Sequence, residues 1–152
     1  MDSVDGLTIL KLATVAAIGA LLSLGLYALV FADGVSYLAD DPETCLNCHA
    51  MRPQFEGWNH SSHKAVAVCD DCHTPQAFVG KWAVKAINGW NHSFAFTTGR
   101  YPDPIRIRPL NARVAQDNCV RCHATMVSQI HVEAAAGAVS CARCHEHVGH
   151  WP

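Results

Sequence analysis

Four copies of the pattern Cys-x-x-Cys-His account for all eight cysteines of this 152-residue chain. Two cysteines at this spacing can form thioethers with the two vinyl groups of one haem, and the histidine that follows can bind the iron. Zinc sites and disulfide frameworks also use paired cysteines, but neither requires a histidine directly after each second cysteine. The pattern therefore predicts four covalently attached haems c. The attachment residues are Cys45, Cys48, Cys69, Cys72, Cys119, Cys122, Cys141 and Cys144, and the motif histidines are His49, His73, His123 and His145.

Residues 12–31 carry no charge and are almost entirely Leu, Ala, Val, Ile and Gly. At about 1.5 Å per residue, a helix of this length spans roughly 30 Å, the thickness of a bilayer's hydrocarbon core. Residues 30–32 resemble a signal-peptide cleavage site, but the apolar run is longer than that of most signal peptides. We therefore expect a retained transmembrane helix over 12–31, after a short tail over 1–11.

The haem motifs also indicate the orientation of the chain. Covalent haem attachment takes place on the outer side of the bacterial inner membrane. Residues 32–152 are therefore predicted to form a periplasmic domain, with the N-terminal tail on the cytoplasmic side. The single basic residue before the span, Lys11, agrees weakly with this orientation.

The periplasmic part has about 120 residues, few for a large hydrophobic core, so the porphyrins must supply much of the apolar interior. We predict a fold that is mostly α-helical and irregular, with two dihaem halves at about 40–100 and 110–152. The three prolines of segment 101–109 favour an extended connector between the halves. The best helix candidates are 76–88 and 111–124, the second capped by Asn111 or Asp117.

The remaining histidines and one methionine are candidate axial ligands. Of ten histidines, six lie outside the motifs. Met51 stands two residues beyond His49, and methionine is a haem ligand that raises the reduction potential relative to histidine. The alternative is a core methionine that fills a gap. The net charge of −2 gives no reason to expect nucleic-acid binding.

One N-terminal span, four motifs and a first motif extended to Cys-His-x-Met resemble the NapC/NirT family of membrane-anchored quinol dehydrogenases. The resemblance covers nearly the whole chain and is strongest for the short tetrahaem form. It implies oxidation of menaquinol and electron transfer to a periplasmic multihaem reductase. In that form the partner is the catalytic subunit of ammonia-forming cytochrome c nitrite reductase, so the resemblance also implies a hetero-oligomer.

The resemblance further implies roles around the first haem, attached through Cys45 and Cys48. Met51, rather than His49, would bind its iron. Lys85, with Lys81 as the alternative, would help to form the quinol pocket. His92 stands seven residues after Lys85, where the family can carry an acidic residue. It would either bind the iron of the first haem or accept a proton from the quinol.

Further axial ligands follow from the same resemblance. His63, preferred to His60, would serve the third haem, and His150 would serve the second. The resemblance also allows the fourth haem to borrow a ligand, such as a lysine, from the partner. His131 and His147 are then either further ligands or polar surface residues.

Two other functions remain open at this point. One is a membrane-tethered electron shuttle that has no quinol site and serves other periplasmic reductases. The second is a catalytic reductase with an open iron, which the spare histidines disfavour.

Trp82 and Trp90 suit a membrane interface, but they could equally well pack on a porphyrin.

Overall fold

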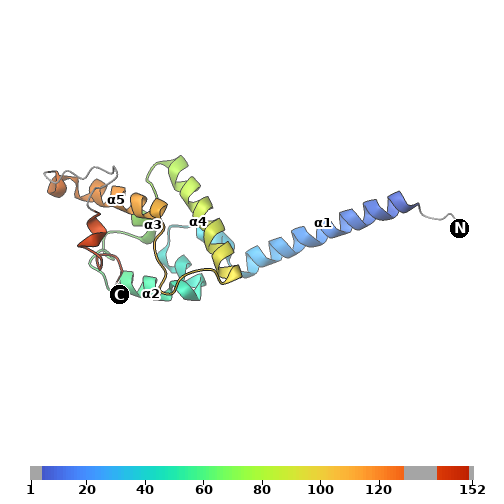
Figure 1. Cartoon of the computed structure of the whole chain (residues 1–152), viewed down its shortest axis with the longest axis horizontal. Helices are drawn as coiled ribbons and strands as arrows, with labels where there is room; N and C mark the ends of the chain where they lie inside the picture. Colours follow the sequence, from blue (N-terminus) through green and yellow to red (C-terminus); the bar gives the residue numbers. More distant parts are fainter. Residues whose placement is uncertain (1–4, 129–139, 151–152) are drawn as a thin grey trace. The chain divides into compact units, whose positions relative to one another are not determined.

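The computed structural model describes residues 5–128 and 140–150, which form helices and irregular segments without any strand (Figure 1). The chain divides into two compact units, the first ending at Tyr37 and the second beginning at Leu38. The prediction of a mostly α-helical and irregular fold is confirmed for this part of the chain.

The first unit contains α1 (Gly6–Phe31), whose residues are all exposed. Asp5 caps its N-terminus, where the side chain accepts a hydrogen bond from the Thr8 N–H at 2.8 Å. The helix is long and apolar enough to cross a membrane. It includes the predicted span and begins six residues earlier, so residues 6–11 of the predicted tail are helical.

The chain turns sharply where α1 ends. Asp33 has a positive φ of 49°. A Cβ atom on Gly34 would lie 2.5 Å from Leu29 Cδ1 and 3.1 Å from the Leu29 carbonyl oxygen, so a side chain there would collide with the helix. Glycine at this position permits the chain to fold back against its own last turn.

The second unit arranges the four motifs on short elements. The first motif lies on two 3₁₀ turns, the second forms a helix of its own, the third occupies the C-terminal part of a long helix and the fourth starts on a 3₁₀ turn. The elements are η2 (Pro42–Asn47), η3 (His49–Met51), α2 (Arg52–Asn59), α3 (Cys69–His73), α4 (Phe78–Thr98), α5 (Pro109–Val127) and η4 (Cys141–Arg143).

The two predicted helices exist, with corrected bounds. Helix α4 runs ten residues further than expected, to Thr98, and is capped by Gly99, which has a left-handed φ of 65°. An irregular connector joins it to α5. The predicted caps of α5 are wrong, because Pro109 occupies the first turn and Arg108 the cap position. Asn111 lies inside the helix instead and donates a hydrogen bond to Asn88 Oδ1 at 3.0 Å.

The polypeptide itself builds very little hydrophobic core. Among the described residues, Val84 and Val114 are the only buried hydrophobic side chains. The other buried residues are Gly57 and the polar or charged Thr74, Lys85, Asn88 and Asn118. Folding of a domain this size requires far more apolar burial than two valines provide. The fold therefore needs a further apolar component, which covalently bound haems would supply.

Candidate haem sites and a buried charge cluster

The structure brings two pairs of histidines close together in the second unit. The ring centres of His63 and His123 lie 6.1 Å apart, and those of His73 and His150 lie 5.9 Å apart. An iron–nitrogen bond of about 2 Å on each side, plus about 1.1 Å from nitrogen to ring centre, places two ligating imidazoles about 6 Å apart. Each pair joins one motif histidine to one histidine outside the motifs. These distances suit an iron atom held between the rings.

Hydrogen bonds orient the non-motif member of each pair. His150 Nδ1 lies 2.9 Å from the Gln54 carbonyl oxygen, to which it donates. This bond leaves Nε2 with its lone pair, the form that binds a metal. Ser62 Oγ contacts His63 Nδ1 at 3.3 Å. His60 is engaged differently, because its Nδ1 lies 2.8 Å from the Glu56 carbonyl oxygen of its own helix.

Trp58 fixes the loop that presents His63. Its indole Nε1–H donates to the Ala67 carbonyl oxygen at 2.9 Å, closing the loop onto α2. Within the loop, the N–H groups of Val66 and Ala67 both donate to the His63 carbonyl oxygen. His63 thus stands in a hydrogen-bonded turn rather than on a free strand of chain.

The electrostatic surroundings keep His73 neutral. Burial lowers the pKa of His73 to about 4, and the neighbouring His150 and His92 add to this effect. A neutral imidazole is the form able to donate a lone pair to iron at neutral pH. Desolvation and then Arg108 also lower the pKa of His92, although much of that residue's surface remains exposed.

Contacts between the motifs follow their order in the chain. The thiols of Cys45 and Cys69 lie within hydrogen-bonding reach, which lowers the pKa of Cys45 to about 7. Helix α3, the second motif, packs against α5, which carries the third motif, and α5 packs against η4 of the fourth motif. The attachment sites therefore form one connected series.

Two carboxamide side chains on α5 secure this series. Asn118 Nδ2 donates to the carbonyl oxygens of Cys72 at 3.1 Å and Thr74 at 2.9 Å. Gln116 accepts from the Cys141 N–H at 2.9 Å and donates to its Sγ at 3.2 Å. Sequence reasoning missed both residues. The available signal was their position within three residues before Cys119, on a predicted helix that carries a motif.

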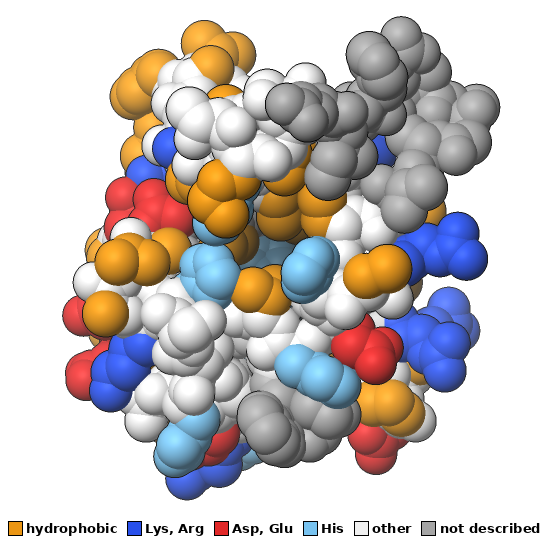
Figure 2. Space-filling model, turned by 90° about the vertical axis from the view of Figure 1, so that its left-hand side faces the viewer, with side chains coloured by type: hydrophobic (Ala, Val, Ile, Leu, Met, Phe, Trp, Pro, Cys, Tyr) orange, Lys and Arg blue, Asp and Glu red, His pale blue; other side chains and the backbone are white. Residues whose placement is uncertain are grey.

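Histidines and hydrophobic side chains gather around a shallow hollow on one face of the molecule (Figure 2). The hollow, the missing hydrophobic core and the spacing of the histidine pairs all suit flat apolar groups bearing an iron. The described residues thus fit covalent haem. Cysteines of the motifs would attach it, and the facing imidazoles would ligate it.

The ends of the series are less enclosed. At the first motif, His49 is exposed and Met51 is half-buried. At the fourth, His145 is exposed, and the Nε2 atom of the exposed His147 lies 3.5 Å from Glu146 Oε1. His131 lies outside the described residues.

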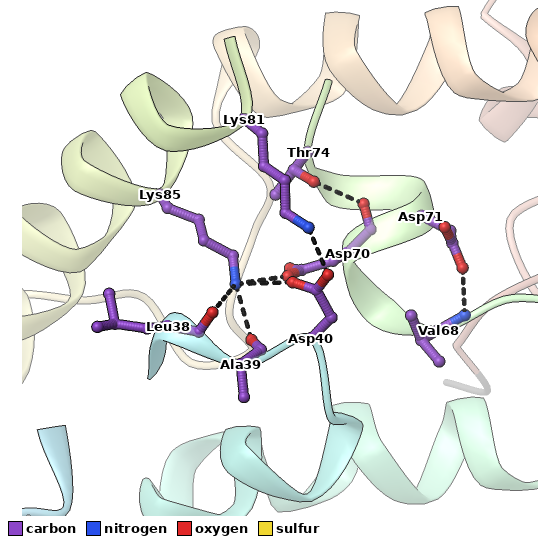
Figure 3. Close-up of polar contacts among 9 residues, drawn as sticks. All are labelled: Leu38, Ala39, Asp40, Val68, Asp70, Asp71, Thr74, Lys81 and Lys85. Carbon is purple, nitrogen blue, oxygen red and sulfur yellow. Dashed lines mark hydrogen bonds and ion pairs between the residues drawn. The ribbon is translucent and has the colours of Figure 1, made fainter. Parts of the chain in front are cut away.

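A buried charge cluster lies beside the second motif (Figure 3). Lys85 is 4% exposed. Its Nζ lies 2.7 Å from Asp70 Oδ2 and 3.1 Å from Asp40 Oδ1, and it donates to the Ala39 carbonyl oxygen at 2.7 Å. Lys81 forms a second ion pair with Asp40. One cation thereby links α4, the second motif and the segment around residues 38–40.

The two carboxyl groups of the cluster differ in their environment. Hydrogen bonds from Lys81, Asp70 and Lys85 hold the pKa of Asp40 well below its usual range. Burial raises the pKa of Asp70. Burial alone would lower the pKa of Lys85, but hydrogen bonds to Asp70 and Asp40 reverse this and raise it. Lys85 is therefore a cation at neutral pH.

Sequence reasoning singled out Lys85 but missed both carboxylates. Asp70 lies between the cysteines of the second motif, a position where a charged residue was visible in the sequence. His92 follows Lys85 on the same helix, about 10 Å further along the axis. It is exposed, whereas Lys85 is buried.

Comparison with known proteins agrees with this arrangement. The family model described as the N-terminal region of the NapC/NirT cytochrome c family matches residues 7–152. The chain is 40% identical over 140 residues to the cytochrome c-type protein NrfH of Wolinella succinogenes, covering 85% of this chain and 79% of that protein. It is 24% identical over 160 residues to the cytochrome c-type protein TorY of Haemophilus influenzae, covering 86% of this chain and 42% of that protein.

A solved structure is also similar. A chain in the crystal structure of the cytochrome c nitrite reductase NrfHA complex bound to the inhibitor HQNO superimposes with a TM-score of 0.64 and 28% identity. The match covers 90% of this chain and 93% of that chain. The family resemblance seen in the sequence is thereby confirmed: the chain belongs to the NapC/NirT family of c-type cytochromes.

Proposed function

We propose that this protein is a membrane-anchored tetrahaem cytochrome that oxidises menaquinol and passes electrons to a periplasmic cytochrome c nitrite reductase. The main observation in support is the two histidine pairs, each at a distance that suits an iron held between the rings. The chain that carries them is 40% identical to NrfH over most of its length. The candidate span α1 supplies the anchor, and residues 32–152 form the periplasmic part.

The chain's residues divide the work of holding four haems. Bound haem c supplies one-electron redox chemistry. His73 and His150 would hold the second haem, and His123 and His63 the third. Met51 would hold the first, which agrees with its half-buried position beside an exposed His49. His145 would serve the fourth, with a further ligand from the partner.

Lys85 and His92 have different tasks at the quinol site. Lys85 is a buried cation whose Nζ is held by Asp40, Asp70 and the Ala39 carbonyl oxygen, so it acts on the quinol through its charge and does not accept its proton. His92 is exposed on the same helix and is the proton acceptor of the pair.

The experiment uses the full haem-loaded chain in liposomes with a reduced menaquinone analogue. Reduction of the haems is followed by absorbance, and dithionite gives the total. We expect rapid reduction by quinol and, after addition of a cytochrome c nitrite reductase, conversion of nitrite to ammonia. Reduction by dithionite but not by quinol would favour a membrane-tethered shuttle without its own quinol site.

Substitutions at His92 separate its two possible roles. A proton acceptor can be replaced by a carboxylate, so His92→Asp should retain appreciable quinol oxidation and His92→Ala should lose most of it. If His92 instead binds the iron of the first haem, both variants should shift that haem's potential. Equal quinol rates in His92→Ala and the native chain would remove His92 from the site.

A further inference from the structure

Helix α4 has an exposed face that is entirely uncharged. Val79 is 78% exposed, Trp90 is 73% exposed and Phe94 is 49% exposed. Ala83 and Ala86 are exposed between them, at the spacing that brings residues to one side of a helix. These five residues make up what we call the outer face of α4. The rings of Trp90 and Phe94 stack, with centres 6.4 Å apart.

The charged residues of α4 point the opposite way. Its two lysines, Lys81 and Lys85, both form ion pairs with Asp40. Val84 and Asn88 are buried on the same side as Lys85. In a helix on the surface of a soluble domain, apolar side chains face the core and charges face water. Helix α4 reverses this arrangement.

The haem-binding side of the unit is not what covers this outer face. The second motif contacts α4 through the ion pair of Asp70 with Lys85. Helix α5, which carries the third motif, contacts it through the hydrogen bond of Asn111 to Asn88. Both contacts lie on the charged side of α4. The outer face is directed away from them, so a different apolar partner is required.

We propose that the outer face of α4 lies in the interfacial region of the lipid bilayer, as a second membrane contact besides the span. This inference rests on the proposed membrane function. Tryptophan and phenylalanine on an uncharged helix face are typical of helices in the plane of a membrane interface. Lys85 also ties α4 to Asp40, which follows the end of the candidate span by only nine residues in the sequence.

This contact has a consequence for substrate access. Lys85 and His92 lie on the opposite side of the same helix, so a bilayer-seated α4 places the proposed quinol-handling residues one helix diameter, ~10 Å, from the lipid surface. The quinol would then have only the width of this helix to pass on its way from the membrane to the site.

The test uses the full haem-loaded chain in nanodiscs that hold one copy each, which excludes cover by a second copy. The lipid includes a phospholipid with a diazirine on its acyl chain near the glycerol, and the adducts are mapped by mass spectrometry after illumination. We expect adducts on α1 and also on the peptide that contains Trp90 and Phe94. Adducts on α1 but none on α4 would overturn the inference and leave the anchor intact. Absence of adducts on both helices would overturn the proposed membrane function as well.

Matched variants add a second readout. The double variant Trp90→Glu/Phe94→Glu should lower the adduct yield on α4 about tenfold or more and leave that on α1 unchanged, because carboxylates are disfavoured in the interface. Met126→Glu on α5 replaces an equally exposed apolar residue (74%) and should change neither yield. Adducts on α4 that persist in the double variant would show that the outer face does not make the lipid contact.

Discussion

Replacing Lys85 by methionine should strongly destabilise the second unit. The side chain keeps its length and apolar stem but loses the charge that lies 2.7 Å from Asp70 and 3.1 Å from Asp40. At an effective dielectric constant of about 20, each of these attractions amounts to roughly 5–6 kcal/mol before desolvation is subtracted. Removal of one partner from a buried ion pair costs about 3–5 kcal/mol. Asp40 is half exposed and contributes less, so we expect a loss of about 3 kcal/mol.

The assay is denaturant unfolding of the haem-loaded chain in detergent, followed by haem absorbance and circular dichroism. Lys81→Met is the matched control, since it removes a more exposed partner of the same Asp40, and it should cost less than about 1 kcal/mol. Adding Asp70→Asn to Lys85→Met should recover part of the loss, because no buried carboxylate is then left without a cation. A cost below about 1 kcal/mol for Lys85→Met, or equal costs for the two lysines, would refute the reasoning.

Four further predictions concern the haems and pH. Mass spectrometry of the denatured chain should show four haem additions, and two or none would contradict the reading of the motifs. Met51→Leu should alter the spectrum of one haem and leave the other three nearly unchanged, whereas no spectral change would exclude its sulfur as a ligand. His150→Ala should convert one low-spin haem to a high-spin or five-coordinate form, visible by electron paramagnetic resonance, and His60→Ala should not. The pKa of Asp40 is lowered in the folded chain, so the unfolded chain binds a proton at this group first as the pH falls. The stability that Asp40 contributes is therefore present above about pH 4 and is lost as the pH falls further. Asp40→Asn should reduce this loss of stability at acid pH in unfolding measurements.

The local chemistry of this protein can be read from its sequence. The Cys-x-x-Cys-His pattern, the uncharged run over 12–31 and the proline-rich connector are each contained in a short stretch of chain. Their meaning depends on covalent spacing, helix length or proline's missing N–H, none of which needs a distant neighbour. The resemblance that these motifs carry extends over nearly the whole chain, which is why the family was recognisable.

Tertiary structure decided what each polar residue does. The resemblance favoured Lys85 and left Lys81 as the alternative, but only packing shows that Lys85 lies buried between two aspartates from other segments. Asn111 satisfied the rules for a helix cap, yet Pro109 starts the helix earlier and Asn111 contacts Asn88 instead. Such partners lie tens of residues apart in the sequence, so only packing brings them together. The secondary-structure propensity of a residue does not predict these contacts. The exposed outer face of α4 has the same origin, because the ion pairs of its two lysines with Asp40 decide which side of the helix faces outward.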